Sequence, residues 1–239
     1  MKITKVFLVC NNNHLYYQYA NDVYDIWEKR IKIKPHLFII SDEKLDVDFG
    51  DRTVQYIKPI PNIPTAFQSQ VIRLLLPCLY KDDVIITTDI DMLPIQKKMF
   101  KKVIKYLNDD MFIQWFQNNQ MCYNCAKGET WSKIFKITKL SQIKPRMKQW
   151  YKDYKGMHTT DQHILKKNVT SYNGPKIILT TYLPDKTMVK RLSTYSDTAI
   201  IFDMKNENLN EYLDFHIHGI FHDKINMIPY KNIVSFLLE

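Results

Sequence analysis

The first hundred residues of the chain alternate between short apolar runs and longer segments whose apolar residues recur at helical spacing. The short runs "ITKVFLVC", "HLFII", "RTVQYIK" and "DVIITT" are typical of strands, whereas "LYYQYANDVYDIWEKRI" and "AFQSQVIRLLLPCLY" are typical of helices. Strands and helices that alternate in this way usually form a mostly parallel sheet with helices packed on it. The sequence therefore predicts an α/β fold with a mixed, mostly parallel sheet and helices on both faces.

After residue 95 the pattern is less regular. "MFIQWF" and "QMCYNC" are typical of strands, and "GETWSKIFKI", "PRMKQWYKDY" and "TTDQHILKKN" are typical of helices. Short apolar runs follow at residues 176–180, 198–202 and 214–218. The 239 residues contain no internal repeat and no linker-like stretch, so we expect a single domain over residues 1–239.

The charge balance favours an anionic partner of some kind. Lysine and arginine number 34 against 25 aspartates and glutamates, which gives a formal net charge of +9. Nucleic acid, a membrane surface and a phosphorylated small molecule would all suit such a charge. The lysines are spread along the chain in short clusters and arginine is scarce, so we expect no nucleic-acid partner.

The apolar runs and cysteines exclude several other classes. No run approaches the eighteen or so apolar residues of a membrane span, and the N-terminus carries only four apolar residues after Lys5. We therefore expect no integral membrane segment, no signal peptide and a cytoplasmic location, which includes the cytoplasm of a virus-infected host cell. Cys122 and Cys125 form an isolated C-x-x-C without the second pair that a zinc site needs.

The run "VIITTDIDMLPI" (residues 84–95) ends a buried strand in two carboxylates, Asp89 and Asp91. On a continuing strand the two side chains would project to the same side and repel each other unless a cation lay between them. Mg²⁺ and Mn²⁺ prefer such oxygen ligands. The alternative to a metal site is that one of the two aspartates only caps the turn before Pro94. Because ligands bind at the carboxyl ends of parallel strands, where residues 11–13 also end the first predicted strand, the pattern favours a metal site there.

Three segments together resemble a known family. "QSQVIRLLLPCLYKDDVIITTDIDMLPI" is similar to the donor site of GT-A fold glycosyltransferases, particularly the glycogenin-like family 8 group, with Arg73, Leu76-Pro77 and residues 89–91 in the same order. "DQHIL" (residues 161–165) is similar to the D-Q-x-x-L of that group, and "HIHGIFH" (residues 216–222) to its H-x-x-G-x-x-K. The resemblance implies a GT-A fold with a donor-binding half (1–95) and an acceptor-binding half (96–239) that carries the late metal-binding motif.

The resemblance also implies an activity and a set of site residues. The activity is metal-dependent transfer of a sugar from a nucleotide-diphosphate donor, most commonly UDP, to a hydroxyl of a glycan or glycoconjugate. The implied cofactor is Mn²⁺ or Mg²⁺, with ligands among Asp89, Asp91, His216 and His218. The implied donor-binding residues are Val9, Asn11, Asn12, Arg73, Asp89, Ile90, Asp91, Gly219, His222 and Lys224. The implied catalytic residues are Asp161, Gln162 and Arg73.

Several of these assignments have alternatives. His222 stands where the family has lysine, and Lys224 is close enough in sequence to replace it. The family's N-x-G is blurred here as residues 118–120, without the glycine. Asp161 would be a general base in an inverting transfer, would lie beside the sugar in a retaining one, or would only cap a helix. Tyr16 or Tyr17 would stack on the donor base or pack in the core.

Two other functions are consistent with parts of the sequence, and the oligomeric state stays open. Another D-x-D metal-dependent nucleotidyltransferase or phosphotransferase would bind a nucleotide and a metal at the same edge, but would need further carboxylates. A non-catalytic basic nucleic-acid-binding protein would explain the charge, but would need clustered arginines.

Overall fold

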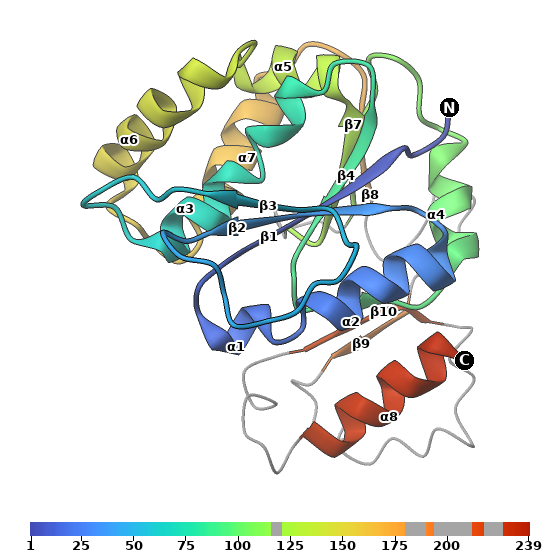
Figure 1. Ribbon diagram of the computed structural model, residues 1–239. Coiled ribbons are helices and arrows are strands. Elements are labelled where there is room, and N and C mark those ends of the chain that lie inside the picture. Colours follow the sequence, from blue (N-terminus) through green and yellow to red (C-terminus); the bar gives the residue numbers. More distant parts are fainter. Residues whose placement is uncertain (116–120, 180–189, 194–211, 218–226) are drawn as a thin grey trace.

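The computed structural model describes residues 1–115, 121–179, 190–193, 212–217 and 227–239 (Figure 1). Its main sheet has seven strands in the order β3-β2-β1-β4-β7-β6-β8, and a smaller sheet has the order β5-β10-β9. The strands of the main sheet are β1 (Lys5–Asn11), β2 (Pro35–Ile40), β3 (Val54–Ile57), β4 (Val84–Thr88), β6 (Phe112–Trp115), β7 (Tyr123–Lys127) and β8 (Lys176–Leu179). The strands of the smaller sheet are β5 (Met92–Pro94), β9 (Lys190–Ser193) and β10 (Tyr212–His216).

The main sheet is mixed but mostly parallel, as predicted. β3, β2, β1 and β4 run parallel to one another, β7 is antiparallel to both β4 and β6, and β8 is parallel to β6. The chain passes from β1 to β2 and β3 on one side and returns to β4 on the other. The order of the strands therefore reverses between β1 and β4, which is where open α/β sheets bind their ligands.

Helices cover both faces of the sheet, because alternate strand residues point to opposite sides. Leu8 of β1 belongs to one apolar core with Trp27 and Phe100, whereas Phe7 belongs to a second core with Leu165. The first face is covered by α2 (Ala20–Asp25), the π-helix η1 (Ile26–Ile31), α4 (Lys97–Ile104) and α8 (Met227–Leu238). The second is covered by α3 (Thr65–Ile72), α5 (Gly128–Phe135), α6 (Ile143–Tyr154) and α7 (Thr160–Thr170). None of the helices in the described residues is long and apolar enough to cross a membrane.

Both helices predicted in the first hundred residues are interrupted. The first is divided into α1 (His14–Tyr17), α2 and η1, and Leu15 of α1 is 42% exposed. The second ends as α3 at Ile72 and continues only as a 3₁₀ turn over Leu76–Leu79. Proline has no amide hydrogen and its ring clashes with the carbonyl four residues earlier, so Pro77 stops the helix at Arg73. The break leaves Arg73 at the C-terminal end of α3.

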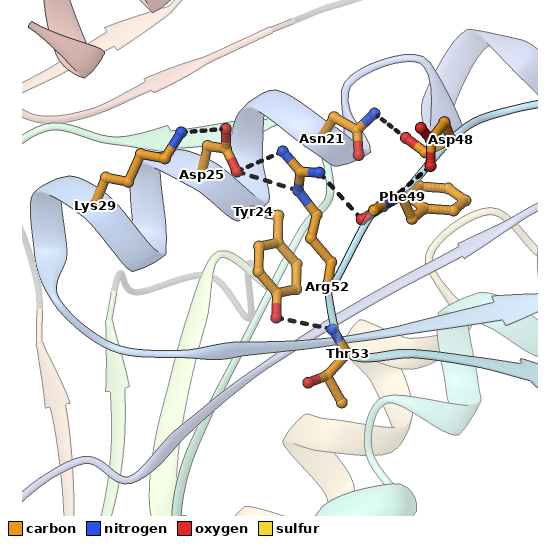
Figure 2. Close-up of polar contacts among 9 residues, drawn as sticks. Asn21, Tyr24, Asp25, Lys29, Asp48, Phe49, Arg52 and Thr53 are labelled. Atoms are coloured by element: carbon orange, nitrogen blue, oxygen red, sulfur yellow. Dashed lines mark hydrogen bonds and ion pairs between the residues drawn. The ribbon is translucent and has the colours of Figure 1, made fainter.

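An arginine before β3 holds the first helices against the sheet (Figure 2). Arg52 donates from Nε (3.1 Å) and Nη2 (2.7 Å) to Oδ1 of Asp25, while Lys29 donates to Oδ2 of the same carboxylate (2.8 Å). The backbone amide of Thr53 donates to the hydroxyl of Tyr24 at 3.0 Å. The entry to β3 is thus fixed to α2 and η1, the helices that follow the end of β1.

Candidate functional site

The first predicted site residues meet at the carboxyl edge of the sheet, beside the switch between β1 and β4. Leu8 pairs with Thr88, so Asn11 and the segment 89–91 leave the two parallel strands at the same edge. Asp89 lies one residue beyond β4, and Asp91 lies in the turn that leads to β5. The strand ends at Thr88, as the run "DVIITT" predicted, so the two carboxylates lie beyond the strand. The turn allows the two side chains to contact different partners.

Arg73 joins two of the predicted carboxylates. Its Nη1 donates to Asp89 and its Nη2 donates to Asp161, while Nε donates to the Gln70 carbonyl at 3.2 Å. Burial alone would lower the pKa of the guanidinium, but the carboxylates of Asp89 and Asp161 outweigh it, so the Arg73 pKa lies above its ordinary value. Arg73 is 9% exposed. It therefore stays charged and holds both carboxylates at the edge of the sheet.

Asp161 is the most buried carboxylate of this group, at 2% exposure. It is the second residue of α7, and its Oδ1 accepts from the amide of Gln162 at 2.8 Å. The helix cap is Thr159, without a side-chain hydrogen bond, so the interpretation of Asp161 as the cap was wrong. A negative charge in the first turn is still favourable, because the amides of a helix N-terminus point toward it.

Asp91 lies beside His216, although 125 residues separate them. β5 and β10 are antiparallel, Met92 pairs with His216, and the Ile217 amide donates to the Asp91 carbonyl at 2.9 Å. Asp91 Oδ2 is 3.7 Å from His216 Nε2, and both side chains are partly exposed. This separation exceeds a normal hydrogen bond and approaches the ~3 Å between neighbouring ligand atoms of one octahedral ion.

The chemistry of this pair fits a divalent metal, since carboxylate oxygen and imidazole nitrogen are both ligands of Mn²⁺. Within the described residues, however, no group of three or more histidine, cysteine, aspartate or glutamate side chains could hold a metal ion. Asp89 is paired with Arg73, whereas Asp91 lies beside His216. His218, Gly219, His222 and Lys224 lie outside the described residues, as do residues 118–120.

Of the two candidate tyrosines, Tyr16 is the one near the aspartates. Burial and then the charges of Asp91 and Asp89 raise the pKa of Tyr16, which is 37% exposed. Tyr17 instead packs against the first apolar core and lies edge-on to His14. Tyr19 is fully buried, and burial together with the charge of Asp91 raises its pKa to about 12.

The asparagines at the end of β1 differ in their exposure. Asn11 is 6% exposed, and its Nδ2 donates to Oγ1 of Thr65 at 3.1 Å; Thr65 Oγ1 in turn donates to Oδ1 of Asn12 at 3.4 Å. Asn12 is exposed. The side chains of Val9 and Ile90 lie in the two apolar cores, so only their backbone groups are left for a ligand.

A row of buried polar side chains was missed by the sequence analysis. Thr87 of β4, Asn124 of β7 and Gln114 of β6 are aligned across three strands and are at most 2% exposed. Thr87 Oγ1, both Asn124 amide atoms and Gln114 Nε2 have no hydrogen-bond partner within the described part of the chain. Strand alternation places them on the face covered by α3 and α7. A polar residue inside each apolar run was the available signal.

Comparison with known proteins identifies the fold. The chain matches no protein-family model and no curated protein. It does match the galactosyltransferase LgtC in complex with donor and acceptor sugar analogues, at 10% identity and a TM-score of 0.53, over 98% of this chain and 95% of that one. It also matches a glycosyltransferase involved in glycosylation of the major capsid of PBCV-1, at 8% identity and a TM-score of 0.55, over 96% and 100% of the two chains.

A third match is the apo form of GlyE from Streptococcus pneumoniae TIGR4, at 12% identity and a TM-score of 0.52, over 99% of this chain and 62% of that one. At such low identity these matches establish the fold alone. The chain has the GT-A glycosyltransferase fold, so the fold expected from the D-x-D segment is confirmed.

Proposed function

We propose that the protein is a glycosyltransferase that moves a sugar from a nucleotide-diphosphate donor, UDP being the first choice, to a hydroxyl of a glycan or glycoconjugate. The observation that carries the proposal is the contact between Asp91 and His216, located at the strand switch of a GT-A fold. Two ligand-type side chains from distant segments meet where α/β sheets bind nucleotides.

Asp91 and His216 are the residues that would hold Mn²⁺ or Mg²⁺. When bound, the ion neutralises negative charge that develops on the leaving diphosphate. Asp89 has a different part in the proposal, because its carboxylate already accepts a hydrogen bond from Arg73. We assign Asp89 to positioning: it keeps Arg73, and through Arg73 also Asp161, at the edge of the sheet.

Asp161 is better suited to electrostatic stabilisation than to proton abstraction. One of its oxygens accepts from Arg73 and the other from the Gln162 amide. Both oxygens therefore already accept hydrogen bonds, and the side chain is 2% exposed, so neither oxygen is open to a proton from an acceptor hydroxyl. A fixed negative charge beside the reacting sugar would favour the positive charge that develops on the ring during transfer. Gln162, half-buried at the same helix end, would contact the sugar or acceptor.

The remaining donor contacts are assigned from the exposure of side chains near the aspartates and from buried polar atoms without partners. Asn12 is exposed and Tyr16 is partly exposed beside the aspartates, so we assign them to the nucleoside. Thr87, Asn124 and Gln114 carry buried polar atoms without partners in the described residues, which destabilises a fold unless something hydrogen-bonds to them. Sugar hydroxyls would satisfy those atoms, so we assign this row to the transferred sugar.

The test is a thermal-shift panel of nucleotide-sugars measured with and without Mn²⁺, since a ligand that binds only the folded state raises the melting temperature. We expect one or more UDP-sugars to raise it only when Mn²⁺ is present. If no nucleotide-sugar stabilises the protein in a Mn²⁺-dependent way, the proposal is wrong. Stabilisation by nucleoside triphosphates alone would instead favour a nucleotidyltransferase.

A further inference from the structure

The helix α4 carries a lysine-rich face. In the sequence its lysines form only short, separate clusters. Phe100 and Val103 are each 1% exposed and anchor the helix in the first apolar core. The outward positions are taken by lysines, with Lys98, Lys101 and Lys105 exposed and Lys97 partly exposed. No aspartate or glutamate occurs between residues 95 and 108. Helical periodicity thus separates the apolar side chains from the charged ones.

Lysines from two other segments join this face. Lys97 has its pKa lowered by partial burial and then by the charges of Lys101, Lys32 and Lys2, which places these side chains close together. Lys2 precedes β1, and Lys32 ends η1 in a left-handed conformation (φ 65°). Figure 1 shows α4 near the N-terminus of the chain, in agreement with this arrangement. The folded chain therefore collects charges that lie up to 99 residues apart in sequence.

This basic face, defined by Lys2, Lys32, Lys97 and Lys101, lacks local compensation. Within the described residues, no ion pair involves any of the four. Other lysines do have acidic partners, for example Lys5 with Asp83. Like charges held together without counter-charges repel one another, so an external polyanion would relieve that repulsion.

We propose that the basic face docks on a membrane surface that carries anionic lipid headgroups. Lysine is a hydrated point charge, which suits diffuse attraction to a charged surface better than bidentate recognition of a single phosphate. The apolar side of α4 is already buried in the core, so the helix adsorbs to the headgroups without inserting. Nucleic-acid surfaces usually add arginine and stacking aromatic residues, whereas all four charges here are lysines.

Flotation of the full chain with vesicles tests the proposal without any substrate, so its outcome is independent of the proposed transferase activity. We expect binding to vesicles of phosphatidylcholine with phosphatidylglycerol, and none to phosphatidylcholine alone. Binding should disappear at high salt, because the screening length falls from about 10 Å at 0.1 M to about 3 Å at 1 M. Failure to bind the anionic vesicles at low salt would overturn the proposal.

A charge-matched pair of variants tests the location. K97E/K101E reverses two lysines one helical turn apart on the basic face. K144E/K148E does the same on α6, where both lysines are exposed. We expect the α4 pair to weaken vesicle binding at least about tenfold more than the α6 pair. Equal weakening by both pairs would show that only net charge matters. Binding to a DNA duplex that depends on the α4 lysines, without vesicle binding, would assign the face to nucleic acid instead.

Discussion

Arg73 and Asp161 form a buried ion pair that joins the C-terminal end of α3 to the first turn of α7. Because Arg73 also pairs with Asp89, one guanidinium links the strand switch to a helix that begins 87 residues after Arg73. Removal of one partner of a buried pair leaves the other charged and unpaired, which typically costs ~3–5 kcal/mol. The R73M variant should therefore lose about that much stability, measured by urea unfolding.

Two further variants separate unpaired charge from lost packing. R73M/D161N should recover part of the stability, because it no longer buries an unpaired Asp161 carboxylate. R146M removes an arginine that donates to the Phe135 carbonyl at 2.8 Å, and it should cost only ~1 kcal/mol. If R73M and R146M are equally destabilised, Arg73 does not hold the two carboxylates as described.

A second prediction concerns Asp91. D91N keeps the shape of the side chain but removes its charge, and the pair that Asp91 forms with His216 is partly exposed, so its loss should not unfold the chain. The variant should fold normally. Mn²⁺-dependent hydrolysis of the nucleotide-sugar donor should fall at least about 100-fold, because an amide is a weaker metal ligand than a carboxylate. D82N changes an exposed aspartate before β4 and is the matched control. Hydrolysis that persists in D91N would remove Asp91 from the metal site.

How far the sequence could predict this molecule depends on the range of the interactions. Apolar runs predicted β1, β2, β3 and β4, because a buried strand needs several apolar residues close together in the sequence. Pro77 also carried a local signal for the break that places Arg73. In contrast, the pairing of Arg73 with Asp161 depends on tertiary packing, to which no local pattern corresponds. The proximity of Lys2 to Lys97 also depends on tertiary packing.

The pH dependence of stability should report on His36. Burial, and then the charges of Lys5 and Lys34, lower the pKa of this imidazole below its ordinary value of 6.5. A group with a lowered native pKa binds fewer protons in the folded state, so stability is full above pH 6.5 and is lost as pH falls through the native pKa. Between pH 7.5 and 5, the loss of urea stability should be smaller in H36Q than in the parent. An identical pH profile for the two would contradict the assignment.

A fourth prediction concerns the C-terminal helix. Tyr230 of α8 donates from its hydroxyl to Oδ2 of Asp22 at 2.6 Å, and its ring lies edge-on to Tyr19. The Asp22 carboxylate is partly buried, and this burial raises its pKa. Y230F would remove the hydroxyl that donates to this carboxylate, and the free energy of unfolding should fall by ~1–3 kcal/mol. Hydrogen exchange should quicken in α8 and α2, whereas Y172F, at the more exposed contact with the Asp110 carbonyl, should leave both helices unchanged.

The last prediction is that a substitution of Asn124 raises stability and lowers activity. Both amide atoms of this fully buried side chain have no partner in the described residues, so the fold tolerates a cost that a ligand would offset. Leucine has nearly the same shape without the polar atoms. N124L should therefore stabilise the ligand-free protein by ~1 kcal/mol and lower donor hydrolysis at least about tenfold. A variant that is stabilised yet fully active would exclude the row of Thr87, Asn124 and Gln114 from sugar binding. A destabilised variant would show that Asn124 has an internal partner.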